Sequence, residues 1–519
     1  MKNKIILILV ALFTAVTLFS GIKGYIGNPT IIELNTKKWK ERGPFELSPE
    51  RGRFALLYSI VEDHSYIFSL PVARFATPDL GIKNNNYVSL FAPGVSFLLI
   101  PGYLIGEILG ASQVGAFSII STFALVNFFL IISISRKIGA DSISSALSAF
   151  VFLFATPAFS YATTIYQHHI SVFLILLSIR VLLVQEVGFW RSFSLWLILF
   201  ASIPIDYPNL ILSFPIVLTL LLSYINKVKM AKKIKLQINW FKFLSIIGAA
   251  IPLLMIMNFN MRSYGKYFQF ASTVGGVQEI DKNGLPTVPE TANKEDSEKF
   301  LRPEERQRSA TNFFKSRHQL PSTNILLFSK DRGVFIFTPV ILLGFIGAFF
   351  IKNKVGQISA SLLLSIILFN VVLYSMRSDA WGGWAFGSRY LIPAYATLSI
   401  LLSLALTNLK GKWYFVILFW ILCTYSIGVN TLGALTTNAI PPKPEAQQLE
   451  IQTNRYERFS YDRNWEYLNN QGTKSFAYQT WGYKYITPLQ YFYIISGSIA
   501  VVATLLTIGV VVSKNNDKN

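Results

Sequence analysis

The chain has 519 residues, of which 52% are hydrophobic and only 14% are charged. A soluble domain is about 25% charged, so this composition excludes a protein whose whole surface faces water. The net charge of +20 is typical of nucleic-acid-binding proteins, but we attribute it to basic cytoplasmic loops facing anionic lipid. We therefore predict an all-α polytopic membrane protein with no nucleic-acid partner.

Apolar segments along the chain predict about twelve transmembrane helices, which at about 20 residues each would use roughly 240 positions. The first runs from Ile5 to Phe19 behind Lys2 and Lys4, and we expect it to be retained as a helix rather than cleaved as a signal peptide. The other predicted spans are residues 113–134, 143–161, 168–185, 192–206, 208–225, 240–258, 333–351, 357–375, 389–407, 413–432 and 488–512.

One further apolar stretch, Tyr87–Gly110, is interpreted as a helix that dips into the membrane without crossing it. Its Pro93 and Pro101 suit an interfacial or re-entrant helix. Counting it as a span would place the five lysines of 227–235 and the other basic connections outside, against the positive-inside rule. We therefore expect a multi-pass protein of the plasma membrane with both termini in the cytoplasm.

This topology divides the chain into two regions. Residues 1–434 form a transmembrane catalytic region with a first outer loop at 25–112 and a long outer loop at 259–332, and residues 435–519 form an outer loop, the last span and a short cytoplasmic tail. The charged stretch 287–308 predicts a flexible loop. A single cysteine, Cys423, excludes an intrachain disulfide, and no zinc or nucleotide motif is present.

The first outer loop contains the strongest candidate for catalysis. Ser48-Pro49-Glu50 has the residues of a helix start, so Glu50 could simply interact with the helix dipole. Arg53, three residues later, lies on the same helix face. The pair has a second interpretation, in which the arginine binds a lipid phosphate and the carboxylate takes a proton from an attacking hydroxyl.

The order of several motifs resembles that of the GT-C superfamily of glycosyltransferases, such as the aminoarabinose transferase and the protein O-mannosyltransferases. Residues 50–55 match an acidic–x–x–Arg–aromatic–Ala pattern, Pro93-Gly94 a Pro–Gly element, 332–339 an RGxFxxxP element, and 381–390 a WGGxxFGxRY element. Two positions depart from the pattern, because Glu50 replaces the usual Asp and Leu90 stands where a lysine is often found.

The resemblance implies a GT-C-like fold with juxtamembrane helices in the first outer loop. It also implies an inverting transfer of a sugar from a polyprenyl-phosphate-linked donor to a protein, lipid or glycan acceptor at the outer face. Glu50 would be the base, with Asp63, Glu62 and Asp79 as runners-up. The donor would contact Arg53, Arg332, Trp381, Trp384, Arg389 and Tyr390. No cofactor is firmly implied, and a divalent metal stays open without a carboxylate cluster to support it.

Weaker signals mark a possible rim of the pocket at Pro93, His168, His169 and Arg262. For the two histidines, metal binding and interface anchoring are alternatives, and the Asp206–Asn209 segment reads as a turn with cavity lining as the minority interpretation. The rival functions are a transporter or lipid flippase and a polysaccharide polymerase or ligase. A transporter should carry ionisable groups near mid-membrane, and the predicted spans contain almost none, which favours surface chemistry.

Overall fold

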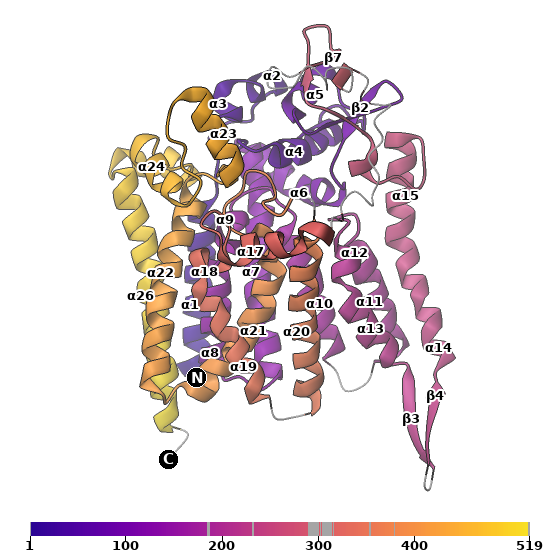
Figure 1. The fold of residues 1–519 in the computed structure, drawn as a ribbon, viewed down its shortest axis with the longest axis vertical. Helices are drawn as coiled ribbons and strands as arrows, with labels where there is room; N and C mark the ends of the chain where they lie inside the picture. Colours follow the sequence, from indigo (N-terminus) through magenta and orange to yellow (C-terminus); the bar gives the residue numbers. More distant parts are fainter. Residues whose placement is uncertain are drawn as a thin grey trace.

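The computed structural model describes residues 2–183, 187–230, 233–288, 300–301, 303, 314, 316–351, 354–377 and 379–516. Helices run side by side in a bundle, and short helices and strands cover one end of it (Figure 1). We call this covering layer the cap; it consists of residues 22–93, 265–288 and 436–487. Most of the stretch predicted as a flexible loop, 287–308, lies outside the described residues.

The bundle is made of long and short apolar helices. They are α1 (Lys2–Gly21), α6 (Gly94–Ile108), α7 (Ser112–Lys137), α8 (Ser142–Phe154), α9 (Ala158–Ala162), α10 (His168–Leu182), α11 (Phe189–Ala201), α12 (Asn209–Leu212), α13 (Phe214–Leu222), α14 (Trp240–Phe243), η1 (Leu244–Ala249), α15 (Ala250–Tyr264), α17 (Gln319–Phe328), α18 (Val334–Phe337), η7 (Pro339–Leu343), α19 (Gly344–Gly347), η8 (Ala348–Phe350), α20 (Lys354–Ser375), η9 (Arg389–Leu391), α21 (Ile392–Leu409), α22 (Trp413–Leu435) and α26 (Pro488–Asn516).

Every predicted span, and the predicted membrane-dipping segment, coincides with an apolar helix. Among the described residues, five helical segments are long and apolar enough to cross a membrane, namely 112–137, 240–264, 389–409, 413–435 and 488–513. Eight further apolar helical segments of the described chain have 10–17 residues each, among them 5–21 of α1 and 359–375 of α20. The helical, membrane-spanning class is therefore confirmed, whereas the number of twelve spans is not established.

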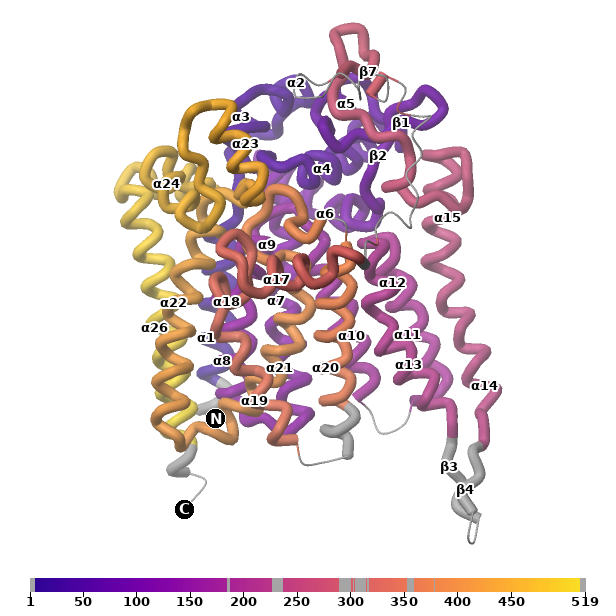
Figure 2. Tube along the Cα trace, in the orientation of Figure 1, coloured from indigo at the N-terminus to yellow at the C-terminus, as the bar shows by residue number. Residues whose placement is uncertain are grey.

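Prolines explain two of the interruptions. The predicted span 333–351 is divided among α18, η7, α19 and η8, because Pro339 has no N–H to continue the ladder. The predicted span 143–161 stops at Phe154, and α9 begins after Pro157. At the end of the bundle away from the cap, the basic connection forms an antiparallel hairpin of β3 (Ile225–Met230) and β4 (Lys233–Ile238). The two termini lie at the same end of the bundle, on the side opposite to this hairpin (Figures 1 and 2).

The cap joins parts of the chain that are far apart in sequence. Its helices are α2 (Ile31–Leu34), α3 (Lys37–Lys40), α4 (Ser48–Val61), α5 (Leu70–Ala76), η2 (Ala271–Thr273), α23 (Lys443–Thr453), α24 (Asp462–Asn470), α25 (Phe476–Thr480) and η10 (Gly482–Lys484). Strand β1 (Leu80–Lys83) lies between β2 (Asn86–Ser89) and β5 (Gly275–Val277), antiparallel to both. The short pair β6 (Glu279–Ile280) and β7 (Pro286–Thr287) lies beside them.

A cluster of buried aromatic rings fixes α4, the helix that carries Glu50 and Arg53, on the bundle. The ring of Phe45 lies 4.6 Å from Phe54, 5.3 Å from Phe75 and 5.5 Å from Phe117 of α7, measured between centroids. Rings at these separations and tilts attract each other beyond the apolar area they bury. The orientation of α4 above α7 is therefore set by packing that precedes any ligand.

Helices α6 and α7 approach closely through glycines. A Cβ on Gly115 of α7 would meet the backbone of Gly102 and Gly106 of α6. Contact between small residues at helix crossings is the usual way to bring two apolar helices together in a membrane. The crossing holds α6 directly below the start of the cap.

We expect Gly115→Ala to destabilise the protein by about 1–3 kcal/mol, because the added methyl group overpacks this crossing. The matched control is Gly428→Ala in α22, where an added Cβ meets nothing within 4 Å; it should be neutral or slightly stabilising. Thermal unfolding in detergent measures both. Equal effects of the two variants on the unfolding temperature would contradict the close contact between α6 and α7 at Gly115.

Candidate active site

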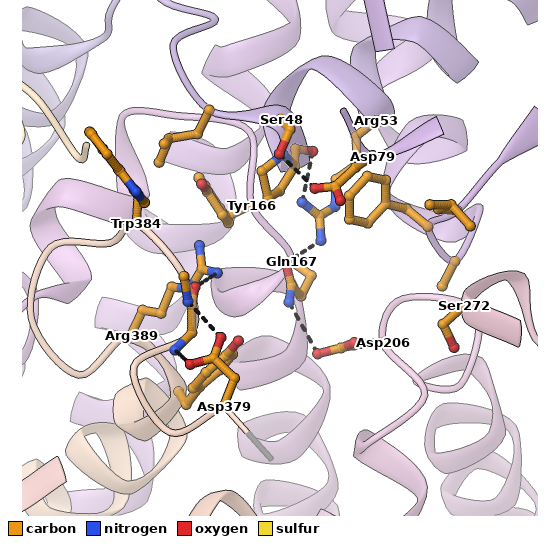
Figure 3. A pocket seen from close by; sticks show the side chains of 18 of the residues that line it. Ser48, Arg53, Asp79, Tyr166, Gln167, Asp206, Ser272, Asp379, Trp384 and Arg389 are labelled. Carbon is orange, nitrogen blue, oxygen red and sulfur yellow. Dashed lines mark hydrogen bonds between the residues drawn. The ribbon is translucent and has the colours of Figure 1, made fainter. Parts of the chain in front are cut away.

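A cavity of about 1030 Å³ lies where the cap meets the bundle. Its lining comes from the first loop, the 166–167 and 203–211 connections, the segment 374–390, and the cap residues 437–471. Figure 3 shows side chains from these segments around the cavity. No described strand residue is part of the lining, so the cavity is built by helix ends and loops.

Arg53 projects from α4 into the cavity and is almost fully buried. Its Nη1 donates to the Pro49 carbonyl at 2.9 Å and its Nη2 to Oε1 of Gln167 at 2.6 Å. Nε2 of Gln167 in turn donates to Oδ2 of Asp206 at 3.1 Å. A hydrogen-bonded chain therefore crosses the cavity floor from α4 to the turn before α12 (Figure 3).

Arg389 approaches from the other side and shares an aromatic partner with Arg53. Its Nη2 donates to the Gly382 carbonyl at 2.6 Å. Both guanidinium groups lie against the ring of Tyr166, with centroid distances of 5.5 Å for Arg53 and 5.1 Å for Arg389. Cations over an aromatic face are stabilised by the ring quadrupole, so Tyr166 keeps the two like charges close together.

Several donors of this group make no hydrogen bond within the described part of the chain. They are Nε of Arg53, Nε and Nη1 of Arg389, and the hydroxyl of Tyr166. A third guanidinium group, that of Arg377, lies 4.5 Å from the centroid of Tyr390, and Arg377 also lines the cavity. Clustered guanidinium groups that line a cavity are suited to an anion with several oxygens, such as a phosphate.

The Trp381–Trp384 segment forms a tight turn that positions Arg389. Gly382 and Gly383 have φ angles of +73° and +64°, which glycine adopts without strain. The carboxylate of Asp379 accepts from the N–H groups of Gly382 at 3.0 Å and Gly383 at 2.7 Å. Trp384 lines the cavity, and Trp381 does not.

Arg332, which the sequence predicts to contact the donor, makes its hydrogen bonds to backbone carbonyls within the protein. Its side chain is fully buried and donates to the carbonyls of Trp381 at 3.0 Å, Gly383 at 2.9 Å and Ile440 at 3.0 Å. It is absent from the cavity lining. Arg332 therefore supports the glycine turn from behind, and the arginines that line the cavity are Arg51, Arg53, Arg377, Arg389 and Arg463.

Glu50 lies behind the cavity wall rather than in it. Its neighbours Pro49 and Arg51 line the cavity, whereas Glu50 is completely buried. One carboxylate oxygen accepts the Leu47 N–H at 3.4 Å, and the other has no partner among the described residues. Burial raises the pKa of Glu50 to about 8, although the positive charge of Lys23 opposes the rise.

A buried ion pair lies beside Glu50. The carboxylate of Glu46 contacts Nζ of Lys474 and also accepts from the Thr437 hydroxyl at 2.9 Å and the Asn438 N–H at 2.6 Å. Burial alone would raise the pKa of Glu46, but Lys474 and Lys23 lower it below its usual value. Burial also lowers the pKa of Lys23 to about 8, and its Nζ has no hydrogen-bond partner within the described chain.

The other acids named from the sequence have different surroundings. Glu62 accepts from the hydroxyl of Tyr103 at 2.7 Å and Asp63 from that of Ser69 at 2.9 Å, both away from the cavity. Asp79 lines the cavity, where its Oδ2 accepts from the hydroxyl of Ser48 at 2.6 Å. Asp79 is thus the one of the four predicted acids that the structure places in the cavity wall.

The predicted rim residues lie outside the lining. Pro93 precedes α6 next to the lining residue Ala92, and His168 is buried with its ring stacked on Tyr166 at 5.8 Å. His169 hydrogen-bonds the Ala158 carbonyl at 2.8 Å. Arg262 borders a separate hollow of about 400 Å³. In the described chain, no group of three or more His, Cys, Asp or Glu residues is placed to hold a metal ion.

Sequence reasoning missed several lining residues, namely Tyr166, Arg377, Asp379, Tyr467 and Gln471, and it gave Asp206 only a minority role. Arg377 follows the end of the predicted span 357–375, and Arg389 begins the next predicted span. The position of Arg377 at the predicted outer face could therefore have marked it as a candidate. Tyr467 and Gln471 reach the cavity only through the folding of the cap, for which the local sequence has no signal.

No protein-family model matches the chain, and no curated protein matches it significantly. Two solved structures are similar: ArnT from Cupriavidus metallidurans in the apo state, with a TM-score of 0.45, 12% identity, and coverage of 97% of this chain and 75% of that one; and the same protein bound to undecaprenyl phosphate, with a TM-score of 0.43, 12% identity, and coverage of 97% and 77%. We rest the functional assignment on this chain's own residues.

We expect Lys474→Met to lower the free energy of unfolding by about 3 kcal/mol or more, because it leaves the Glu46 carboxylate buried without its counter-charge. The matched control is Arg458→Met, which breaks the exposed pair with Glu466 and should cost less than about 1 kcal/mol. The measurement is thermal or urea unfolding in detergent. A small loss in Lys474→Met would mean that the pair does not hold the cap.

The raised pKa of Glu50 predicts a pH-dependent stability. The folded chain keeps the proton between the ordinary pKa of 4.5 and about 8, so the native protein loses stability as the pH rises through this window. Glu50→Gln lacks the ionisation, and its stability relative to the native chain should increase from pH 5 to pH 8. Unfolding measured across this range checks it, with the exposed Glu466→Gln as control; a decrease would mean that Glu50 is ionised when folded.

Proposed function

We propose that the protein is an integral-membrane glycosyltransferase of the GT-C type, which transfers a sugar from a polyprenyl-phosphate-linked donor to an acceptor hydroxyl with inversion. The observation that carries the proposal is a cavity lined by the guanidinium groups of Arg53, Arg377 and Arg389 beside an apolar, exposed rim. The arginines suit a phosphate, and the rim suits a lipid chain attached to it.

The donor phosphate is assigned to the group formed by Arg53, Arg377 and Arg389. Guanidinium groups bind phosphate oxygens through parallel N–H donors, and donors already in place stabilise the charge that develops on a leaving phosphate. The apolar rim is formed by Leu210, Ile211 and Phe270, whose side chains are 53%, 38% and 46% exposed. The polyprenyl chain would leave the cavity over this rim.

In the proposed reaction the acceptor oxygen attacks C1 of the sugar. The bond between C1 and the phosphate oxygen breaks, the electron pair leaves with the polyprenyl phosphate, and the hydroxyl proton passes to a carboxylate. A base must be within reach of the hydroxyl, and we assign this role to Asp79 because, of the four acids named from the sequence, it is the one that lines the cavity. Glu50 is the second candidate, since its raised pKa and unfilled carboxylate oxygen suit a proton acceptor.

The cap is proposed to face the outside of the plasma membrane, with both termini in the cytoplasm. Lys137 at the end of α7 and the Lys410–Lys412 turn after α21 belong to connections at the end of the bundle away from the cap. The positive-inside rule places such connections in the cytoplasm. A lipid-linked sugar at the outer leaflet would then reach the cavity from the side of the bundle.

We expect Arg389→Met to lower kcat/KM for the donor by roughly 10²–10³-fold, the usual effect of removing one donor to a developing anion. The assay uses the full chain in phospholipid nanodiscs and labelled polyprenyl-phosphate sugars. Arg458→Met, an exposed arginine away from the cavity, is the control. If the reconstituted chain moves a lipid or solute across a bilayer and forms no glycosyl product, the transporter alternative is correct.

The same assay separates the two candidate bases. Asp79→Asn should lower kcat at least 100-fold with little change in the KM for the donor, because general-base catalysis contributes about 10²–10⁴-fold. Glu50→Gln should retain most of the activity. The reverse result would assign the base to Glu50.

A further inference from the structure

The cavity has a second side that the proposed donor contacts leave unused. It is formed by Glu41, Trp384, Thr437, Arg463, Tyr467 and Gln471. In Figure 3, Trp384 lies on the opposite side of Tyr166 from Asp206. The volume of about 1030 Å³ is at the upper end of the roughly 300–1,000 Å³ of small-molecule pockets, so the cavity has room for a second substrate beside the donor head group.

The two aromatic side chains of this side are held in place by charged neighbours. Nε1 of Trp384 donates to Oε1 of Glu445 at 2.6 Å, and the Arg463 guanidinium lies 5.4 Å from the Trp384 ring. Nζ of Lys474 lies 5.3 Å from the Tyr467 ring. The rings are therefore fixed before any ligand arrives, which reduces the entropy lost on binding.

The basic groups near these rings already have acidic partners. Nη1 of Arg463 donates to Glu457 at 2.8 Å, and Lys474 contacts Glu46. The donor side differs, because there Nε of Arg53 and Nε and Nη1 of Arg389 have no hydrogen-bond partner within the described chain. A second anion would gain little here, whereas aromatic faces with the amide of Gln471 and the carboxylate of Glu41 suit a neutral ligand rich in hydroxyl groups.

The construction of this side does not fit an extended peptide. Peptides commonly bind by adding a strand to a sheet edge, and none of the described strand residues lines the cavity. Ring faces with hydroxyl, amide and carboxylate groups instead match the apolar faces and hydroxyl edges of sugar rings.

We propose that Trp384, Tyr467 and Gln471 form an acceptor subsite, and that the acceptor is a neutral carbohydrate chain. The inference rests on the proposed glycosyltransferase function and adds the class of the second substrate. The acceptor sugar lies against the Trp384 and Tyr467 rings and presents one hydroxyl toward the donor C1. The new bond joins that oxygen to C1 as the polyprenyl phosphate departs.

The test uses the full chain in nanodiscs with a panel of labelled polyprenyl-phosphate hexoses and pentoses. Neutral oligosaccharides and unstructured Ser/Thr peptides are offered separately as acceptors. We expect label on the oligosaccharides, and an acceptor KM raised about tenfold in Tyr467→Ala and in Gln471→Ala. The donor KM should change much less than the acceptor KM. Gln471 is exposed and follows the last residue of α24, so its variant should fold. The control is Asn469→Ala, at an exposed position near the end of α24 and outside the lining.

The possible outcomes separate the two proposals. Label on peptides alone, or an unchanged acceptor KM in both variants, overturns the carbohydrate subsite while the glycosyltransferase proposal stands. No consumption of any donor, or consumption that does not depend on Arg389, contradicts the glycosyltransferase proposal and the subsite with it.

Discussion

The buried ion pair between Glu46 and Lys474 is the interaction on which the cap depends. Moving two charges out of water is costly, and the cost is offset only when the remaining hydrogen-bonding positions are also filled. Here Thr437 and Asn438 donate hydrogen bonds to the Glu46 carboxylate, and Lys474 also donates to the Gly43 carbonyl at 2.9 Å. The first loop and the last loop are thereby joined at one point above the bundle. Glu46 and Tyr467 therefore line the cavity at fixed positions, and the two sides of the cavity keep their separation.

In the motif at 381–390, some residues line the cavity and others only hold the backbone in place. Gly382, Gly383, Trp384, Arg389 and Tyr390 line the cavity, whereas Trp381 does not. Asp379 and Arg332 hold the glycine turn from two sides. Arg332 belongs to a separate motif some fifty positions earlier. From sequence, an arginine at a predicted outer membrane face suggests ligand contact, yet Arg332 is buried and donates to four backbone carbonyls. Which arginine is available to a ligand is decided by tertiary contacts that the motif does not encode.

The sequence predicted the helical class because hydropathy depends on composition over about twenty residues, a local property. It also located Arg53, Asp79, Trp384, Arg389 and Tyr390 in segments that converge on one cavity. It could not predict how often the helices are interrupted, since Pro339 and Pro157 act together with their packing partners. The sequence also could not show that Glu50 lies behind the cavity wall. That position follows from the Phe45 cluster and from Lys23 and Lys474, which are brought in from the two ends of the chain.

The meeting of the chain's beginning and end has a consequence for biosynthesis. Lys23 pairs with Ser475 in an isolated bridge, the Gly24 N–H donates to the Lys474 carbonyl at 3.2 Å, and the Phe476 N–H donates to the Ile22 carbonyl at 2.7 Å. The helices made first must therefore wait in the bilayer, with Glu46 lacking its partner, until a segment translated more than four hundred residues later arrives. A nascent chain therefore cannot complete the cavity wall until residues 437–476, which supply part of the lining and the partners of Ile22 and Gly24, have been translated.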